Sequence, residues 1–159
     1  MRKRAFMAFV YEINVLQEWI DHNGHMRDAY YGLVFSFAGV AAQEALGFDP
    51  NYRSRTGCSI YLVEDHKFFL REVHLGDPLR VETYVLDSDE KSFHLYLSLS
   101  CNGKLCAVAE YMELHVNQLP SPHAATIPEA IQARLRAEQL DPDILQSMRP
   151  RAGQIGIRR

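Results

Sequence analysis

The chain has 159 residues, of which 47% are hydrophobic and 23% charged, a size and balance that suit one compact domain with its own core. The formal net charge is -3 at pH 7, with 17 Lys and Arg against 20 Asp and Glu, so nucleic acid is disfavoured as a partner. The longest uncharged run, Ala29 to Gln43, is shorter than the roughly 20 residues that span a bilayer. We therefore expect no membrane association.

The cysteines and the N-terminal residues point to a cytoplasmic protein. Cys58, Cys101 and Cys106 are odd in number and show no CxxC spacing, which argues against a disulfide framework and against a zinc site. The apolar stretch that follows the basic residues at positions 2–4 is interrupted by Glu12 and lacks a small-residue cleavage site, so a signal peptide is not expected.

The first predicted elements are a strand and a long helix. Apolar and polar residues alternate over Phe9–Val15, which predicts the strand. From about Met26 to Leu46 the sequence lacks turn residues and then reaches Gly47, which predicts a helix that ends there. This helix has almost no polar face, and a helix that is apolar all round must be buried on most sides. Its apolar positions are Leu33, Val34, Phe35, Phe37, Ala38, Val40, Ala41 and Ala42.

Four segments of strand character follow the helix. They are Ser59–Val73, Leu79–Asp87, Ser92–Cys101 and Leu105–Val116. Turn residues separate them, most clearly at Asn102-Gly103, a strong hairpin signal. The order of strand, buried helix and four antiparallel strands predicts an α+β hot-dog fold, in which one long buried helix is wrapped by a curled five-stranded antiparallel sheet.

The composition changes after the last predicted strand. We expect the hot-dog domain to span residues 1–118. Residues 119–159 form a C-terminal extension with a short helix from about Pro128 to Gln139. The extension is too short for a second domain, and we expect it to dock on the surface as part of the same domain.

The segment from Trp19 to Met26 lies between the first strand and the helix start, where unpaired backbone N–H groups can hold an anion or polarise a carbonyl. Asp21 could attack a polarised carbonyl carbon, or activate a water that does so. Backbone N–H groups near Arg27 and Asp28 would then stabilise the oxyanion. The alternative is that Asp21 or Asn23 only caps the helix.

A second candidate pair, Glu64 and His66, lies on the long strand after the helix. Strict alternation puts both on the same face as Ile60 and Leu62. Because buried charge is costly unless it is paired, the two side chains should satisfy each other or line a cavity near the helix start. The alternatives are a purely structural buried pair, or a bulge that turns both outward. The spacing His22-x-x-His25 is a weak metal signal, and we expect no metal.

Several short motifs resemble a known family. Asp21, Gly24-His25, Tyr31 and Gly76-Asp77 occur in the order typical of the 4-hydroxybenzoyl-CoA-thioesterase-like branch of the hot-dog superfamily. The chain is most similar to the betainyl-CoA thioesterases of carnitine degradation. The segments that carry this closer resemblance are 18–21, 23–26, 63–66, 72–73, 85–86, 90–91, 94–95, 110–112 and 115–116.

The resemblance implies an acyl-CoA thioesterase that hydrolyses a small, cationic acyl-CoA, with betainyl-CoA as the leading candidate, to the free acid and CoA. No cofactor or metal is implied. The catalytic residues would be Asp21, His25, Asp28, Glu64 and His66. The substrate-binding residues would be Trp19, Asn23, Gly24, Tyr31 and Tyr61.

Two other functions remain open, a hot-dog acyl-CoA dehydratase or hydratase and a non-catalytic acyl-CoA-binding module. In each case we expect self-association as a homodimer or a dimer of dimers. A curled five-stranded sheet leaves unpaired edges, which proteins cover or pair.

Overall fold

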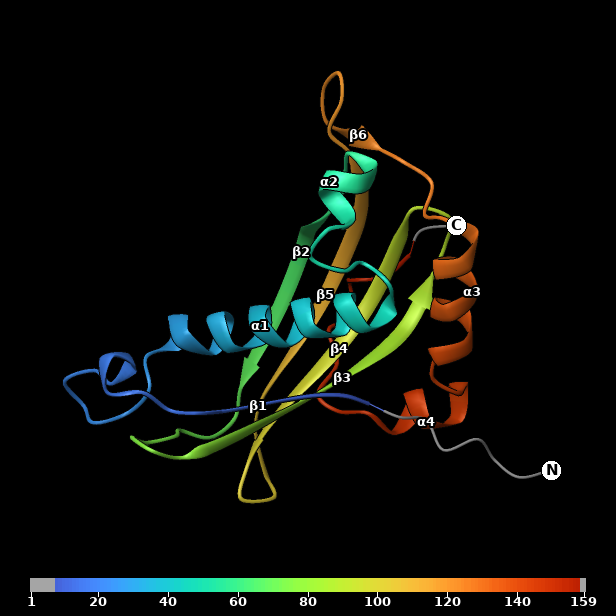
Figure 1. Ribbon diagram of the computed structural model, residues 1–159. Helices are drawn as coiled ribbons and strands as arrows, with labels where there is room; N and C mark the ends of the chain where they lie inside the picture. Colours follow the sequence, from blue (N-terminus) through green and yellow to red (C-terminus); the bar gives the residue numbers. More distant parts are fainter. Residues whose placement is uncertain (1–7, 158–159) are drawn as a thin grey trace.

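The computed structural model describes residues 8–157 and shows one long helix lying across a curled antiparallel sheet (Figure 1). The helix is α1 (Asp28–Leu46). The sheet strands are β1 (Phe9–Asn14), β2 (Cys58–Phe69), β3 (Pro78–Ser88), β4 (Ser92–Cys101) and β5 (Lys104–Asn117), in the spatial order β1-β3-β4-β5-β2. The predicted hot-dog fold is confirmed. The one addition to the sheet is the two-residue strand β6 (His123–Ala124), which pairs with β5.

Short helices complete the described part of the chain. They are the 3-10 helix η1 (Gln17–Trp19), α2 (Tyr52–Thr56), α3 (Glu129–Glu138) and α4 (Pro142–Ser147). Helix α3 confirms the helix predicted in the C-terminal extension, and its Ile131 and Leu135 join the main core cluster. The boundary at residue 118 stays a prediction. No helix in residues 8–157 is long and apolar enough to cross a membrane.

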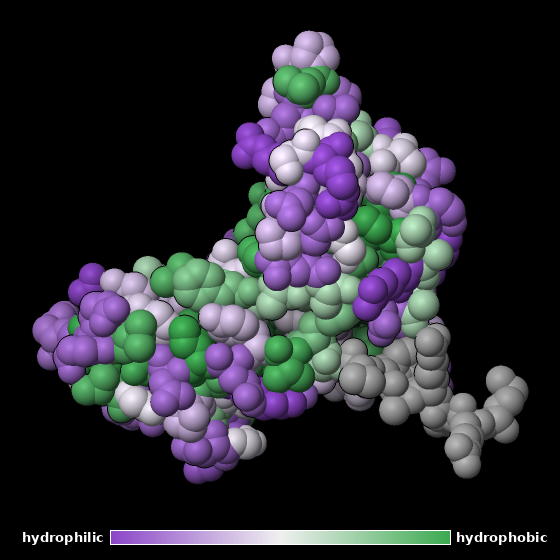
Figure 2. All heavy atoms as spheres, viewed as in Figure 1, coloured by the Kyte–Doolittle hydropathy of each residue, from purple (hydrophilic) through white to green (hydrophobic). Residues whose placement is uncertain are grey.

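Helix α1 is buried on one side only. Its core face consists of Tyr31, Val34, Phe35, Ala38, Gly39, Ala42 and Leu46. On the opposite side Leu33, Phe37 and Val40 are 37%, 40% and 47% exposed, and apolar residues gather along α1 in Figure 2. The expectation that this helix is buried on most sides is therefore wrong for the single chain, because one sheet covers only the face that packs on it.

Strand β2 changes the direction of its side chains at a bulge. The register with β5 shifts between Leu62 and Glu64. Before the shift, Ile60 packs against the core. After it, Phe69 packs against Tyr31 of α1, with ring centroids 5.4 Å apart. Residues of the same parity as Phe69 therefore face the helix, and the alternate ones face the other side of the sheet.

The bulge overturns one expectation. Glu64 and His66 do not share the helix-facing side with Ile60, and both are exposed. The alternative in which a bulge turns both side chains outward is the arrangement found.

The other face of the sheet is covered by a C-terminal strap, residues 139–157. Leu140 clusters there with Leu86, Tyr96 and Val108. Farther along, Ala152 and Ile155 cluster with Met112. The sequence of β4 alternates as if one face met solvent, yet both faces of β4 are buried. The strap explains this, because it covers the second face.

Glu113 of β5 is a buried carboxyl whose titration should affect stability. It is 3% exposed, and its Oε1 accepts a hydrogen bond from Gln43 Nε2 at 3.1 Å. Burial raises the pKa of Glu113 to about 7. Because the folded state favours the protonated form, the free energy of unfolding should fall as pH rises from the ordinary carboxyl pKa to about 7. Above that pH range the contribution of Glu113 to the free energy of unfolding no longer changes with pH.

We expect Glu113→Gln to remove this part of the pH dependence, about 3 kcal/mol between pH 4 and 8. Glutamine retains an amide oxygen that can accept from Gln43 and carries no charge at any pH. Urea unfolding of wild type and variant, measured at several pH values, checks this. Identical pH profiles for the two proteins would contradict it.

Candidate active site

A pocket of about 380 Å³ lies where the start of α1 meets the end of β2. We call it the α1 pocket. Its lining residues are Asp21, His25, Met26, Asp28, Tyr31, Phe69, Leu70, Arg71 and Glu72. The pocket joins segments far apart in sequence, because the chain that leaves β2 passes the start of α1, where Met26 N–H donates to Val73 O at 2.9 Å.

The Asp21 carboxylate is held by the turn that precedes α1. Its Oδ1 accepts from Asn23 N–H at 2.8 Å and from His25 N–H at 3.4 Å. The hydrogen bond from Asn23 is the main cause that lowers the pKa of Asp21 below its ordinary value. Gly24 has a φ of 81°, a conformation that favours glycine and lets the turn close. Asp21 is thus a fixed, ionised carboxylate at the pocket wall.

The start of α1 offers backbone donors beside this carboxylate. The N-cap residue is Arg27, without a side-chain capping bond, so the alternative that Asp21 or Asn23 caps the helix is wrong. Tyr30 N–H donates to Arg27 O at 3.0 Å. The N–H groups of Asp28 and Ala29 belong to the first turn, where a helix supplies no acceptor of its own. First-turn N–H groups of this kind can stabilise an oxyanion.

Aromatic residues shape the pocket and its support. The Tyr31 hydroxyl donates to Arg71 O at 3.2 Å, which ties α1 to the end of β2. Burial raises the pKa of Tyr31 to about 12, so the phenol stays neutral. Trp19 is 4% exposed and stacks on Tyr30 at 5.6 Å. Trp19 thus belongs to the core that supports the turn and is not part of the pocket lining.

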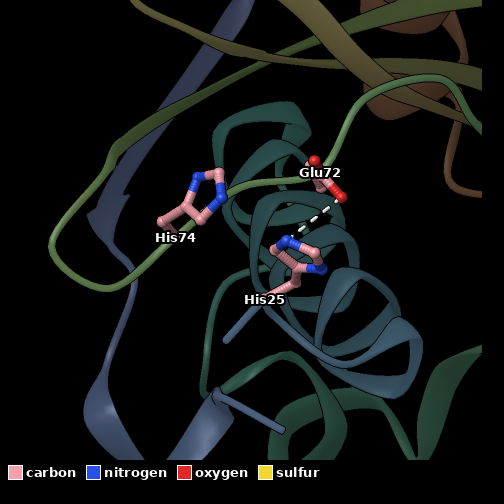
Figure 3. A group of neighbouring side chains, drawn as sticks. All are labelled: His25, Glu72 and His74. Carbon is pink, nitrogen blue, oxygen red and sulfur yellow. Dashed lines mark ion pairs between the residues drawn. The ribbon is translucent and has the colours of Figure 1, made fainter. Parts of the chain in front are cut away.

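Three side chains lie close together beside the pocket (Figure 3): those of His25 and Glu72, which line it, and that of His74. His25 Nε2 lies 3.2 Å from Glu72 Oε2, and the His25 and His74 rings are 5.1 Å apart. One donor atom from each of the three lies within 4.8 Å of the others. These are residue types that bind zinc, although a shared ion would sit about 2 Å from each donor and would need them closer together. The absence of a metal stays a prediction.

Glu64 and His66 lie at a different pocket. This second pocket, about 350 Å³, is formed by β2 and the C-terminal strap, with Phe68 and residues 151–155 among its lining. Tyr61 is 39% exposed and accepts a hydrogen bond from Gln118 Nε2 at 3.3 Å. Within one chain, these three predicted site residues are therefore not assembled with Asp21.

The structure brings together part of the predicted set and adds to it. Asp21, His25, Asp28 and Tyr31 line the α1 pocket, and Asn23 and Gly24 shape the turn that holds Asp21. Sequence reasoning missed the contribution of Phe69, Arg71 and Glu72. Glu72 lies in one of the segments that carry the family resemblance, but nothing local to it indicates proximity to Asp21.

Comparisons with known proteins identify the family of this chain. Residues 15–135 match the family model of the Thioesterase-like superfamily. A curated betainyl-CoA thioesterase of Pseudomonas aeruginosa is 41% identical over 80% of this chain and 80% of its own length. An L-carnitine dehydrogenase/betainyl-CoA thioesterase of Rhizobium is 33% identical over 80% of this chain, which corresponds to 26% of that larger protein.

Solved structures share the fold. A Staphylococcus aureus protein, solved in complex with CoA, has a TM-score of 0.78 and 28% identity, and the match covers 94% of this chain and all of that one. A 1,4-dihydroxy-2-naphthoyl-CoA thioesterase of Synechocystis has a TM-score of 0.72 and 20% identity over 81% of this chain and 96% of its own, which shows the fold alone. With the family match over most of its length and its curled sheet and helix, this chain belongs to the Thioesterase-like superfamily and is a hot-dog enzyme of the thioesterase class.

Proposed function

We propose that this enzyme hydrolyses a small, cationic acyl-CoA, with betainyl-CoA as the first candidate, to the free acid and CoA. The observation that carries the proposal is the ionised Asp21 carboxylate, fixed beside the first-turn N–H groups of α1 at a pocket. The substrate class is supported by the Pseudomonas aeruginosa relative, which is a betainyl-CoA thioesterase. The CoA moiety is supported by the complex of the Staphylococcus aureus protein.

In the proposed mechanism the thioester carbonyl oxygen accepts hydrogen bonds from the N–H groups of Asp28 and Ala29. Asp21 then acts in one of two ways. As a nucleophile it forms an anhydride and expels the CoA thiolate, and water hydrolyses the anhydride. As a general base it takes a proton from the water that attacks the carbonyl directly. Both routes consume one water and release one carboxylic acid and one CoA thiol.

A hydrolysis screen tests the reaction. Free thiol release is measured over short, branched, aromatic and cationic acyl-CoAs, and an enoyl-CoA is followed in parallel for addition of water to the double bond. We expect thiol release, fastest with betainyl-CoA. Hydration without thiol release would favour the hydratase alternative, and binding without any reaction would favour the non-catalytic module.

We also propose that the working enzyme is a homodimer or a dimer of dimers. Two surfaces support this: the edge of β2, where Val63 is 53% exposed, and the outer face of α1 with Phe37 and Val40. Contiguous apolar patches and open strand edges are usually covered in a stable protein.

The expected mass in light scattering is two or four times 18.2 kDa. Val40→Asp should shift the mass toward smaller species, because it places a charge in an apolar contact. Ile144→Asp, at a position that is 41% exposed on α4, is the matched control and should leave the mass unchanged. A wild-type protein that is monomeric and fully active would contradict the proposal.

A further inference from the structure

The α1 pocket carries more negative than positive side chains. Three carboxylates, those of Asp21, Asp28 and Glu72, are among its lining residues, against the guanidinium of Arg71 and the imidazole of His25. With His25 neutral, the formal charge of this set is -2. Such a site opposes the negatively charged phosphates of CoA and favours a positive charge on the acyl group.

The pocket also contains aromatic surface. Phe69 is 53% exposed, and the buried ring of Tyr31 supports it edge to face at an interplanar angle of 87°. A quaternary ammonium group has no N–H to donate, so it is bound best by aromatic rings and by a nearby carboxylate rather than by directed hydrogen bonds. Both kinds of group are present here within one pocket lining.

The three carboxylates are not equivalent. Asp21 accepts two backbone hydrogen bonds from its own turn and is the proposed reacting group. Asp28 is the first residue of α1, where the positive end of the helix dipole stabilises its charge. Glu72 is on the chain segment that leaves β2, lines the pocket and is paired with His25 at 3.2 Å (Figure 3).

We propose that Glu72, together with the exposed ring of Phe69, recognises the cationic end of the acyl group. This inference rests on the proposed function and deepens it. It assigns the charge recognition to Glu72 and not to Glu64, a carboxylate of the predicted site whose side chain lies at the pocket between β2 and the C-terminal strap. His25 is a positioning residue in this arrangement, because its backbone N–H contacts Asp21 and its ring contacts Glu72.

The test compares betainyl-CoA with 3,3-dimethylbutyryl-CoA, in which a neutral tert-butyl group replaces trimethylammonium. We measure kcat/KM for both thioesters with wild type, Glu72→Gln and Glu64→Gln. Glu129→Gln is the matched control, because Glu129 is an exposed carboxylate paired with Arg136 on α3. Wild type should prefer the cation. Glu72→Gln should lower kcat/KM for betainyl-CoA about tenfold and leave the neutral thioester within about twofold.

Each outcome decides the assignment. Equal losses on both thioesters in Glu72→Gln, or a loss of cation preference in Glu64→Gln instead, would overturn it. If wild type hydrolyses neither thioester, the proposed hydrolysis of these substrates fails. Calorimetric binding of the two intact thioesters to wild type and Glu72→Gln then still tests recognition, and an unchanged affinity ratio would refute the role of Glu72.

Discussion

Asp21→Asn is expected to lower kcat at least about 100-fold while the protein stays folded. Asparagine has the same shape, and its Oδ1 can still accept from Asn23 N–H, so the turn before α1 should persist. The amide is neither a nucleophile nor a base at neutral pH. The native carboxylate is ionised there, and the hydrogen bond from Asn23 lowers its pKa further below neutral pH. Steady-state thiol release, measured beside a thermal melt, checks both parts of the expectation.

The matched control is Asp89→Asn. Asp89 Oδ1 also accepts from nearby backbone N–H groups, those of Lys91 at 2.8 Å and Ser92 at 2.7 Å, in the turn between β3 and β4. It is therefore the same change in the same kind of turn, at a residue outside the α1 pocket lining. Its activity should match wild type. Near-normal turnover in a folded Asp21→Asn would remove Asp21 from the mechanism.

The local part of the site could be predicted from sequence because the residues involved are close in the chain. Asp21 and His25 interact within one turn, and Tyr31 follows on the first turn of α1. The position of Asp21 next to a helix start suggests the chemistry, and the family resemblance adds His25 and Tyr31. The fold was predictable for a similar reason, since alternation and turn residues such as Asn102-Gly103 are local signals.

The rest of the site depends on long-range pairing. The bulge at Val63 exists only as a mismatch between β2 and β5, and no residue of β2 marks it. The assumption of strict alternation along β2 ignores this bulge, and it therefore placed Glu64 and His66 on the wrong face of the sheet. Glu72 reaches the pocket because the chain beyond β2 passes the start of α1, a contact made across some 50 residues of sequence, from Met26 to Val73.

The outer face of α1 was misjudged for a different physical reason. A sequence shows that a helix is apolar all round, but it does not distinguish a cover made by the same chain from one made by a second copy. Leu33, Phe37 and Val40 satisfy the pattern of a buried helix and yet lie at the surface of the single chain.

Arg151→Met is expected to destabilise the protein by about 3 to 5 kcal/mol, because it leaves a buried charge without its partner. Glu110 of β5 is 0% exposed and forms an ion pair with Arg151, while its Oε2 accepts from Ala152 N–H at 2.9 Å. His94 Nε2 lies 4.0 Å from Glu110 Oε1, and its imidazole is neutral in the wild-type protein because burial is the main cause that lowers its pKa to about 4. A loss of this size lowers the melting temperature by roughly 6 to 20 °C in a chain of this length.

Two further variants separate the buried charge from the loss of side-chain packing. Arg136→Met breaks the exposed pair with Glu129 and should cost less than about 1 kcal/mol. In Glu110→Gln combined with Arg151→Met, the buried site is neutral on both sides, so the double variant should be more stable than Arg151→Met alone. Two results would contradict this: an Arg151→Met variant that melts like wild type, or a double variant that is no more stable than Arg151→Met. In either case the buried ion pair does not hold the C-terminal strap on the sheet. The apolar contacts of Leu140, Ala152 and Ile155 must then do so.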